Sequence, residues 1–128
     1  MTPKVLIVDD ELYILESVGY VVRSAGFEPL TAQDGETGLA LAFSEIPDLI
    51  ILDVMLPKMT GLEVCRRIRE NPATKTIPVI MLSARGQEAD ELQGMKSGAD
   101  EYMTKPFSPR RLKARIEALI AGHGPSGG

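Results

Sequence analysis

The sequence of 128 residues contains no tryptophan and a single cysteine, Cys65. One cysteine excludes an intramolecular disulfide, so we expect the chain to work in the reducing cytoplasm. Its longest apolar runs have four or five residues, far fewer than the roughly 20 that a membrane-spanning helix needs. We therefore expect no membrane association, and residues 1–4 lead into a strand pattern instead of a secretory signal.

An excess of positive charge is also missing, since 14 basic residues face 18 acidic ones and the formal net charge is −4. This balance argues against direct nucleic-acid binding by the domain. The length fits one compact domain, and the 44% of apolar and 25% of charged residues are ordinary for a globular protein. We expect a single domain over residues 1–121, followed by a glycine-rich flexible tail or linker stub over residues 122–128.

What is present is an alternation of two apolar patterns. Three unbroken apolar runs and two weaker ones predict strands at residues 5–8, 28–31, 49–52, 79–82 and 101–104. Between them, apolar residues recur at spacings of three and four, which indicates helices, the last of them over residues 108–121. Five strand–helix repeats predict an α/β fold, in which helices cover both faces of a parallel sheet.

Residues that begin and end helices support this division. Thr60 and Glu63 have the spacing of a capping box at a helix start. Gly26 and Gly98 stand where a glycine that ends a helix belongs. Cys65 falls on the apolar stripe of the helix after Thr60, so we expect it to be a core residue and not a nucleophile.

Polar residues follow the predicted strands at the points where they end. Asp9 and Asp10 follow the first strand, Asp53 the third, Ser83 the fourth and Lys105 the last. Because the carboxyl ends of parallel strands meet at one edge of the sheet, where ligands bind, we expect these side chains to converge.

The chemistry of such a cluster points to metal and phosphate. Three carboxylates held together repel one another unless a cation joins them, and oxygen ligands at an open edge suit Mg²⁺. With Lys105 and a metal neutralising the charge, a carboxylate can attack phosphorus and form an aspartyl phosphate. Asp53 is the best candidate, because it stands alone after the middle strand. Taken alone, the acidic run 9–11 is also consistent with capping of the first helix.

Four segments resemble the motifs of the receiver domain of two-component response regulators: Leu6–Glu11, Leu52–Pro57, Leu82–Ala84 and Lys105–Phe107. The resemblance covers about residues 4–121, with the motifs in the family's order. It implies a flavodoxin-like fold, a doubly wound (βα)5 parallel sheet with strand order 2-1-3-4-5. It also implies a signalling switch that accepts a phosphoryl group on Asp53 from a sensor histidine kinase or a phosphotransfer protein.

The resemblance further implies a metal site. A Mg²⁺ ion (or Mn²⁺) would be held by Asp10, Asp53 and the backbone carbonyl of Met55, with Asp9 acting through water. In this family the domain is a regulator and not an enzyme, with at most slow self-phosphorylation from small phosphodonors and autodephosphorylation.

Further residues match the family's phosphoryl-contacting positions, Ser83 and Lys105, and its switch positions, Ser83 and Tyr102. Ser83 and Lys105 match the hydroxyl and the lysine that contact the phosphoryl group, and the Lys105–Pro106 peptide bond is expected to be cis. Phosphorylation would draw Ser83 toward the phosphoryl group and let the ring of Tyr102 rotate into the vacated space. The face built by the fourth helix, fifth strand and fifth helix would then be remodelled and would control an output domain or partner.

Charge on this face suggests an interface between two copies of the chain. Acidic residues precede and begin the last strand, whereas the last helix is basic. Acid on one copy can meet base on the other about a twofold axis, giving a phosphorylation-dependent homodimer. Two solvated faces explain the pattern equally well. The candidate residues are Asp90, Glu91, Asp100, Glu101, Arg111 and Arg115.

Three other functions are alternatives to that of a receiver domain. A phosphatase of the haloacid dehalogenase type also uses an aspartyl nucleophile and magnesium, but it needs a second acid where this chain has Met55. A flavodoxin needs a phosphate-binding loop after the first strand, where Asp9 and Asp10 would repel a phosphate. A receiver used only as a scaffold would normally have lost part of the acidic site, which is complete here.

Overall fold

The computed structural model describes residues 2–84 and 93–122. Their elements are β1 (Lys4–Val8), α1 (Leu12–Ser24), β2 (Glu28–Ala32), α2 (Gly35–Glu45), β3 (Leu49–Asp53), α3 (Gly61–Glu70), β4 (Val79–Ser83), β5 (Glu101–Thr104) and α5 (Pro109–Gly122). Residues 93–96 are helical too. The predicted interface residues Asp90 and Glu91 lie outside the described residues, as does all of the predicted tail except Gly122, which ends α5.

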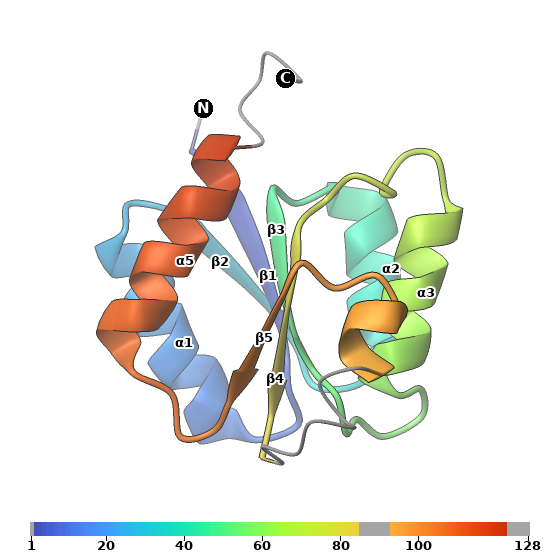
Figure 1. The fold of residues 1–128 in the computed structure, drawn as a ribbon, viewed down its shortest axis with the longest axis horizontal. Helices are drawn as coiled ribbons and strands as arrows, with labels where there is room; N and C mark the ends of the chain where they lie inside the picture. The colour runs from blue at the N-terminus through green and yellow to red at the C-terminus, as the bar shows by residue number, and fades with distance from the viewer. Residues whose placement is uncertain (1, 85–92, 123–128) are drawn as a thin grey trace.

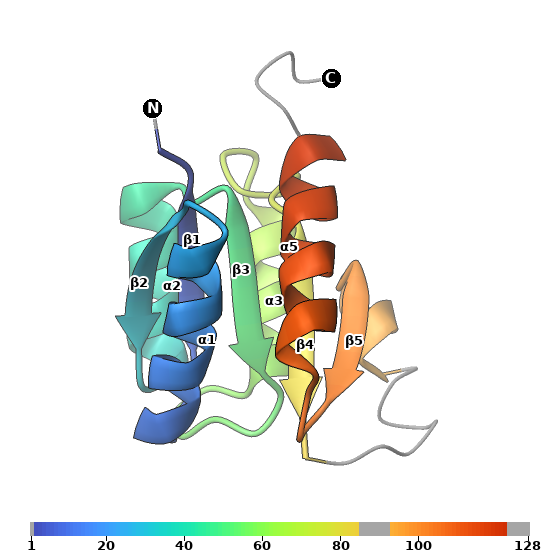
Figure 2. The same ribbon diagram turned by 90° about the vertical axis from the view of Figure 1, so that its left-hand side faces the viewer.

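The five strands form one parallel sheet in the order β2-β1-β3-β4-β5, so the predicted fold and strand order are confirmed. Helices α1 and α5 cover one face of the sheet, and α2 and α3 cover the other (Figure 1). Figure 2 looks onto the α1–α5 side and shows the strands pointing the same way. All strands therefore deliver their carboxyl ends to the same edge, which in Figure 1 is the lower one.

The middle strands are buried on both faces, as their unbroken apolar runs predict. Alternate residues of each strand join two separate cores. Leu6, Ile50 and Met81 pack on the side of α2 and α3, whereas Ile7, Ile51 and Ile80 pack on the side of α1 and α5. Two cores of this kind hold the strand ends in fixed register and so fix the residues that follow them.

Local signals in the sequence agree with the helix ends. The Thr60 side chain accepts a hydrogen bond from the Glu63 backbone N–H at 3.2 Å, while the Glu63 carboxylate pairs with arginines of its own helix. Gly26 and Gly98 both have positive φ, at 89° and 111°. Cys65 is fully buried in α3, which confirms the expectation of a core residue. Within the described residues, no helix is long and apolar enough to cross a membrane.

Candidate functional site at the carboxyl edge of the sheet

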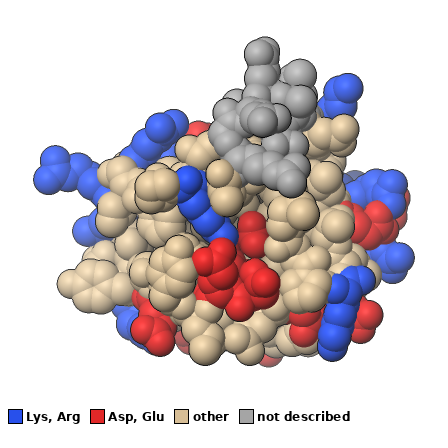
Figure 3. All heavy atoms as spheres, turned by 90° about the horizontal axis from the view of Figure 1, so that it is seen from below, with Lys and Arg blue, Asp and Glu red and all other residues tan. Residues whose placement is uncertain are grey.

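Lys105, directly after β5, reaches across the edge of the sheet to residues that follow β1 and end β3. Its Nζ lies 2.8 Å from Oδ2 of Asp9, 3.6 Å from Oδ1 of Asp53 and 3.4 Å from Oε1 of Glu11. The Lys105 side chain is only 9% exposed, so its ion pairs with the buried carboxylates of Asp9 and Asp53 are shielded from water, whereas the Glu11 side chain is 44% exposed. Figure 3 views this edge directly and shows acidic side chains gathered near its centre, with a basic one beside them.

Asp9, Asp10 and Asp53 form a group of carboxylates at this edge, with one oxygen of each within 4.8 Å of the others. Asp9 and Asp53 are buried, whereas Asp10 is exposed. Asp9 is fully engaged by the protein, because its Oδ1 accepts a hydrogen bond from the Glu11 N–H at 2.9 Å and its Oδ2 accepts one from Lys105. Glu11, the residue before α1, makes no side-chain hydrogen bond that caps the helix.

The environment of Asp53 opposes its negative charge. Burial raises the pKa of Asp53 from 3.8 to about 6, and the charges of Asp9 and Asp10 act in the same direction. Lys105 and a hydrogen bond from the Met55 backbone oppose this change only in part. A carboxyl group that binds a proton so readily, beside two further acids, has the chemistry of a site that takes up a divalent cation. The residues present therefore fit a Mg²⁺ site.

Lys105 has the complementary environment. Burial disfavours its charge, but the hydrogen bond to Asp9 and the charges of Asp53, Asp9 and Glu11 outweigh this and raise the pKa of Lys105. The ammonium is therefore positive throughout the physiological range, and it is a permanent partner for negative charge at this edge.

The segment that follows Asp53 is folded tightly against the end of its own strand. Gly61 donates its N–H to the carbonyl of Val54 at 2.9 Å, and a Cβ at Gly61 would lie 2.0 Å from the carbonyl oxygen of Asp53. Only glycine fits this close approach. The result places the Met55 backbone beside the Asp53 carboxylate while the Met55 side chain is 59% exposed.

Ser83 lies on β4, the strand next to β3, and Tyr102 lies on β5, the edge strand on the far side of β4. Ser83 ends β4 with a buried side chain, and its carbonyl accepts the Lys105 N–H at 2.7 Å. Tyr102 lies in β5, paired in register with Met81, and packs against the core on the side of α2 and α3. The Lys105–Pro106 peptide bond is cis.

Two contacts of the structure are absent from the sequence analysis. Glu11 joins the ion-pair cluster around Lys105. Its position directly after Asp9 and Asp10 in the sequence could have indicated this contact. Arg69, at the end of α3, pairs with Asp100 at 2.9 Å, and no spacing in the sequence indicates this contact.

Glu101 pairs with Arg115 at 3.0 Å within the chain, so these predicted interface residues already have partners.

Similarity to known proteins shows the family of this chain. Residues 5–117 match the family model described as the response regulator receiver domain. The chain belongs to this family. It is 47% identical over 120 residues to the alkaline phosphatase synthesis transcriptional regulatory protein PhoP of Bacillus subtilis, covering 94% of this chain and 49% of that protein. It is 46% identical over 121 residues to the phosphate regulon transcriptional regulatory protein PhoB of Pseudomonas aeruginosa, covering 94% and 53%. The chain thus spans about half the length of these relatives.

Solved structures agree with the family. The Francisella response regulator 1452 receiver domain superposes with a TM-score of 0.89 at 32% identity, covering 96% of this chain and all of the other. The BeF3-activated receiver domain of DrrB gives a TM-score of 0.84 at 36% identity, covering 94% and 99%. The chain is therefore the receiver domain of a two-component response regulator, a phosphorylation-activated switch, and the comparisons give no support to a phosphatase.

Proposed function

We propose that Asp53 is the residue that accepts the phosphoryl group, from the phosphohistidine of a sensor histidine kinase or of a phosphotransfer protein. An Asp53 carboxylate oxygen forms the new bond to phosphorus while the bond from phosphorus to the imidazole nitrogen breaks and leaves its electron pair on that nitrogen. The main support is the approach of the Lys105 ammonium to the Asp53 carboxylate, at 3.6 Å, beside two further acids at the sheet edge.

Asp10, Asp53 and the backbone carbonyl of Met55 are the proposed ligands of Mg²⁺ or Mn²⁺. Asp9 acts through water, because both of its carboxylate oxygens already accept hydrogen bonds from the protein. When bound, the cation neutralises negative charge on the carboxylates and on the phosphoryl oxygens. Lys105 supplies the same stabilisation from the side of β5.

Ser83 and Tyr102 are the proposed switch residues. Ser83 ends the strand beside β3, where Asp53 pairs in register with Leu82, so its hydroxyl is placed one residue from the phosphorylation site. Phosphorylation draws that hydroxyl and permits a second position of the Tyr102 ring, which remodels the face made by residues 93–100, β5 and α5. Ser83→Ala should allow phosphorylation of Asp53 but abolish the change on this face.

Because PhoP and PhoB are transcriptional regulators about twice as long, we extend the proposal to a DNA-binding output domain or partner. A phosphorylation-dependent homodimer would use the face of β5 and α5. Its basic helix α5 supports this, although Asp100, Glu101 and Arg115 must first leave or share their intrachain partners. Sedimentation of the chain with and without beryllofluoride tests the dimer.

Acetyl phosphate with Mg²⁺, followed by intact mass measurement, tests the phosphorylation site. The wild-type chain should gain one phosphoryl group and Asp53→Asn none, while the exposed carboxyl variant Asp48→Asn should behave as wild type. Phosphorylation of Asp53→Asn to the wild-type level would overturn the assignment. Continuous rapid release of phosphate would instead indicate a phosphatase, whereas we propose a regulator with only slow autodephosphorylation.

A further inference from the structure

The ring of Tyr102 packs against a glycine on the neighbouring helical turn. Gly94 is buried, and residues 93–96 are helical. A Cβ at Gly94 would lie 3.1 Å from Cδ2 and 3.4 Å from Cε2 of Tyr102, and 3.6 Å from Cγ of Met81. Two of these distances are shorter than the optimal separation of about 3.5–4.0 Å between carbon atoms. The missing side chain of Gly94 therefore leaves the space that the Tyr102 ring fills.

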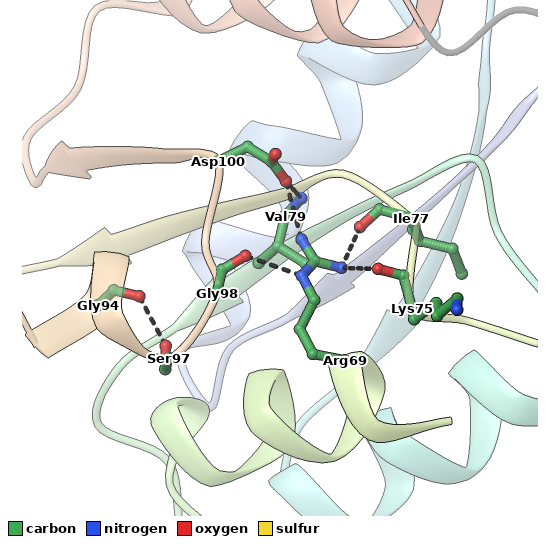
Figure 4. Close-up of polar contacts among 8 residues, drawn as sticks. All are labelled: Arg69, Lys75, Ile77, Val79, Gly94, Ser97, Gly98 and Asp100. Atoms are coloured by element: carbon green, nitrogen blue, oxygen red, sulfur yellow. Dashed lines mark hydrogen bonds and ion pairs between the residues drawn. The ribbon is translucent and has the colours of Figure 1, made fainter. Parts of the chain in front are cut away.

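The turn that carries Gly94 is held at its far end by Arg69. Figure 4 shows the Arg69 side chain reaching from the end of α3 toward Gly98 and Asp100. Its Nε donates to the Gly98 carbonyl at 2.9 Å, and its Nη2 pairs with Oδ2 of Asp100 at 2.9 Å. Gly98 lies so close that a Cβ there would be 2.7 Å from Cγ of Arg69.

Further contacts anchor Arg69 and Asp100 themselves. Arg69 Nη1 donates to the carbonyls of Lys75 and Ile77, at 3.2 and 2.6 Å, in the segment that leads into β4 (Figure 4). Oδ2 of Asp100 also accepts the Val79 N–H at 2.8 Å. The guanidinium thus ties α3, the approach to β4 and residues 98–100 into one hydrogen-bonded unit. Gly94 is linked to this unit, because its carbonyl accepts the Ser97 hydroxyl at 2.6 Å and the Ala99 N–H at 3.3 Å.

We propose that Gly94 is a positioning residue of the switch: its lack of a side chain sets the resting position of the Tyr102 ring, and Arg69 holds the turn of Gly94 against that ring. This inference rests on the proposed switch role of Tyr102. Because the turn is fixed through Gly98 and Asp100, a methyl group added at Gly94 displaces the ring and not the helix. Through Arg69, the position of the Tyr102 ring depends on contacts at the amino-terminal edge of the sheet, which is the edge opposite Asp53.

Fluorine NMR of the chain labelled with 3-fluorotyrosine tests the proposal. The sequence has three tyrosines, and Tyr13 and Tyr20 lie on α1, exposed by 64% and 73%. Without any phosphoryl mimic, Gly94→Ala should shift the Tyr102 signal. Gly19→Ala is the matched control, because Gly19 is also helical and its Cβ would contact only Arg23, at 3.8 Å. A Tyr102 signal that stays at its wild-type position in Gly94→Ala would overturn the proposal.

Beryllofluoride with Mg²⁺ separates this inference from the proposed function. If the wild-type Tyr102 signal does not respond to the mimic, the switch role of Tyr102 fails, whatever Gly94→Ala does. If it responds, Gly94→Ala should still bind the mimic but show a smaller Tyr102 response, because its ring has already left the resting position. A full wild-type response in Gly94→Ala would count against Gly94 as a positioning residue.

Two double variants test the physical cause. Alanine is the better helix former, so Gly94→Ala should raise the melting temperature more in the Tyr102→Ala background, where there is no ring to displace, than in the wild-type background; an equal change in both backgrounds would exclude the contact. Arg69→Lys loses the planar fork that holds the turn. The Tyr102 shift of Gly94→Ala should therefore be smaller in the Arg69→Lys background than in the wild-type one. Equal shifts would refute the role of Arg69.

Discussion

Lys105 spans the carboxyl edge of the sheet, and its Nζ lies 2.8 Å from Oδ2 of Asp9, although the two residues are 96 positions apart in the sequence. Asp9 is 1% exposed and Lys105 is 9% exposed. A buried carboxylate of this kind depends on its partner, because removal of one member of a buried pair leaves the other charge unpaired and desolvated. The pair therefore links the stability of the fold to the charge around Asp53, the proposed phosphorylation site.

Replacement of Lys105 by methionine tests this link. Lys105→Met keeps most of the side-chain volume but leaves Asp9 without its cation, so the free energy of unfolding in metal-free buffer near pH 7 should fall by about 3 kcal/mol. Urea unfolding of both proteins at this pH measures the loss. Lys58→Met, at an exposed pair 3.9 Å from Asp34, is the control and should cost much less.

The raised pKa of Asp53 predicts an unusual pH dependence. Because the pKa is about 6 in the fold and about 3.9 in the unfolded chain, the folded state binds more protons between these values. The contribution of Asp53 to stability therefore falls as pH rises through this window, by about 3 kcal/mol, and is constant above it. Asp53→Asn lacks this loss, so in EDTA it should match the wild type near pH 4 and be more stable near pH 7.

Urea unfolding of both proteins across this range measures the difference between them, in which the titration of other groups cancels. A constant difference between wild type and Asp53→Asn from pH 4 to pH 7 would show that Asp53 titrates normally in the fold.

Strain at the end of α2 gives a prediction about stability alone. Ile46 has φ of 44° and ψ of 65°, a left-handed conformation that costs a β-branched residue about 1–2 kcal/mol. Asparagine tolerates this conformation, and the Ile46 side chain is 45% exposed, so little burial is lost. Ile46→Asn should raise the free energy of unfolding by about 1 kcal/mol, measured by urea unfolding. Ile46→Val keeps the strain and should give no gain.

The convergence at the sheet edge could be predicted because it follows from topology. A polar residue directly after a buried parallel strand must lie at the carboxyl edge of the sheet. The order of strands and polar residues in the sequence was therefore enough to predict that Asp9, Asp53 and Lys105 lie together. The predicted ends of two middle strands were one residue short. β3 and β4 each include the polar residue that follows the apolar run, Asp53 and Ser83, because ladder hydrogen bonds do not depend on the side chain.

The contacts of Arg69 could not be predicted in the same way. Three of its hydrogen bonds go to backbone carbonyls of Lys75, Ile77 and Gly98, whose positions depend on loop conformation and leave no periodic signal. Asp100 illustrates the consequence. Its charge suggests an interface residue, yet its carboxylate is already bound within the chain, by Arg69 and by the Val79 N–H. Charge patterns indicate a face of the protein, but not the direction of each side chain.

The exposed acid of the site, Asp10, provides the test of metal binding. Asp10→Asn removes one negative ligand without disturbing the Lys105–Asp9 pair, so the fold should be retained while the affinity for Mg²⁺ falls at least tenfold. In the wild type, Mg²⁺ at about 100 times its dissociation constant should stabilise the fold by about 2.7 kcal/mol. Melting curves over a Mg²⁺ titration measure both effects, with Asp48→Asn as the matched control.

The same titration has a defined pH dependence, because a proton on Asp53 competes with the cation. Mg²⁺ affinity should therefore decrease as pH falls below about 6, where the Asp53 carboxyl becomes protonated in the metal-free fold. An affinity that is constant from pH 7 to pH 5, or an Asp10→Asn variant that responds to Mg²⁺ as the wild type does, would place the metal away from these carboxylates.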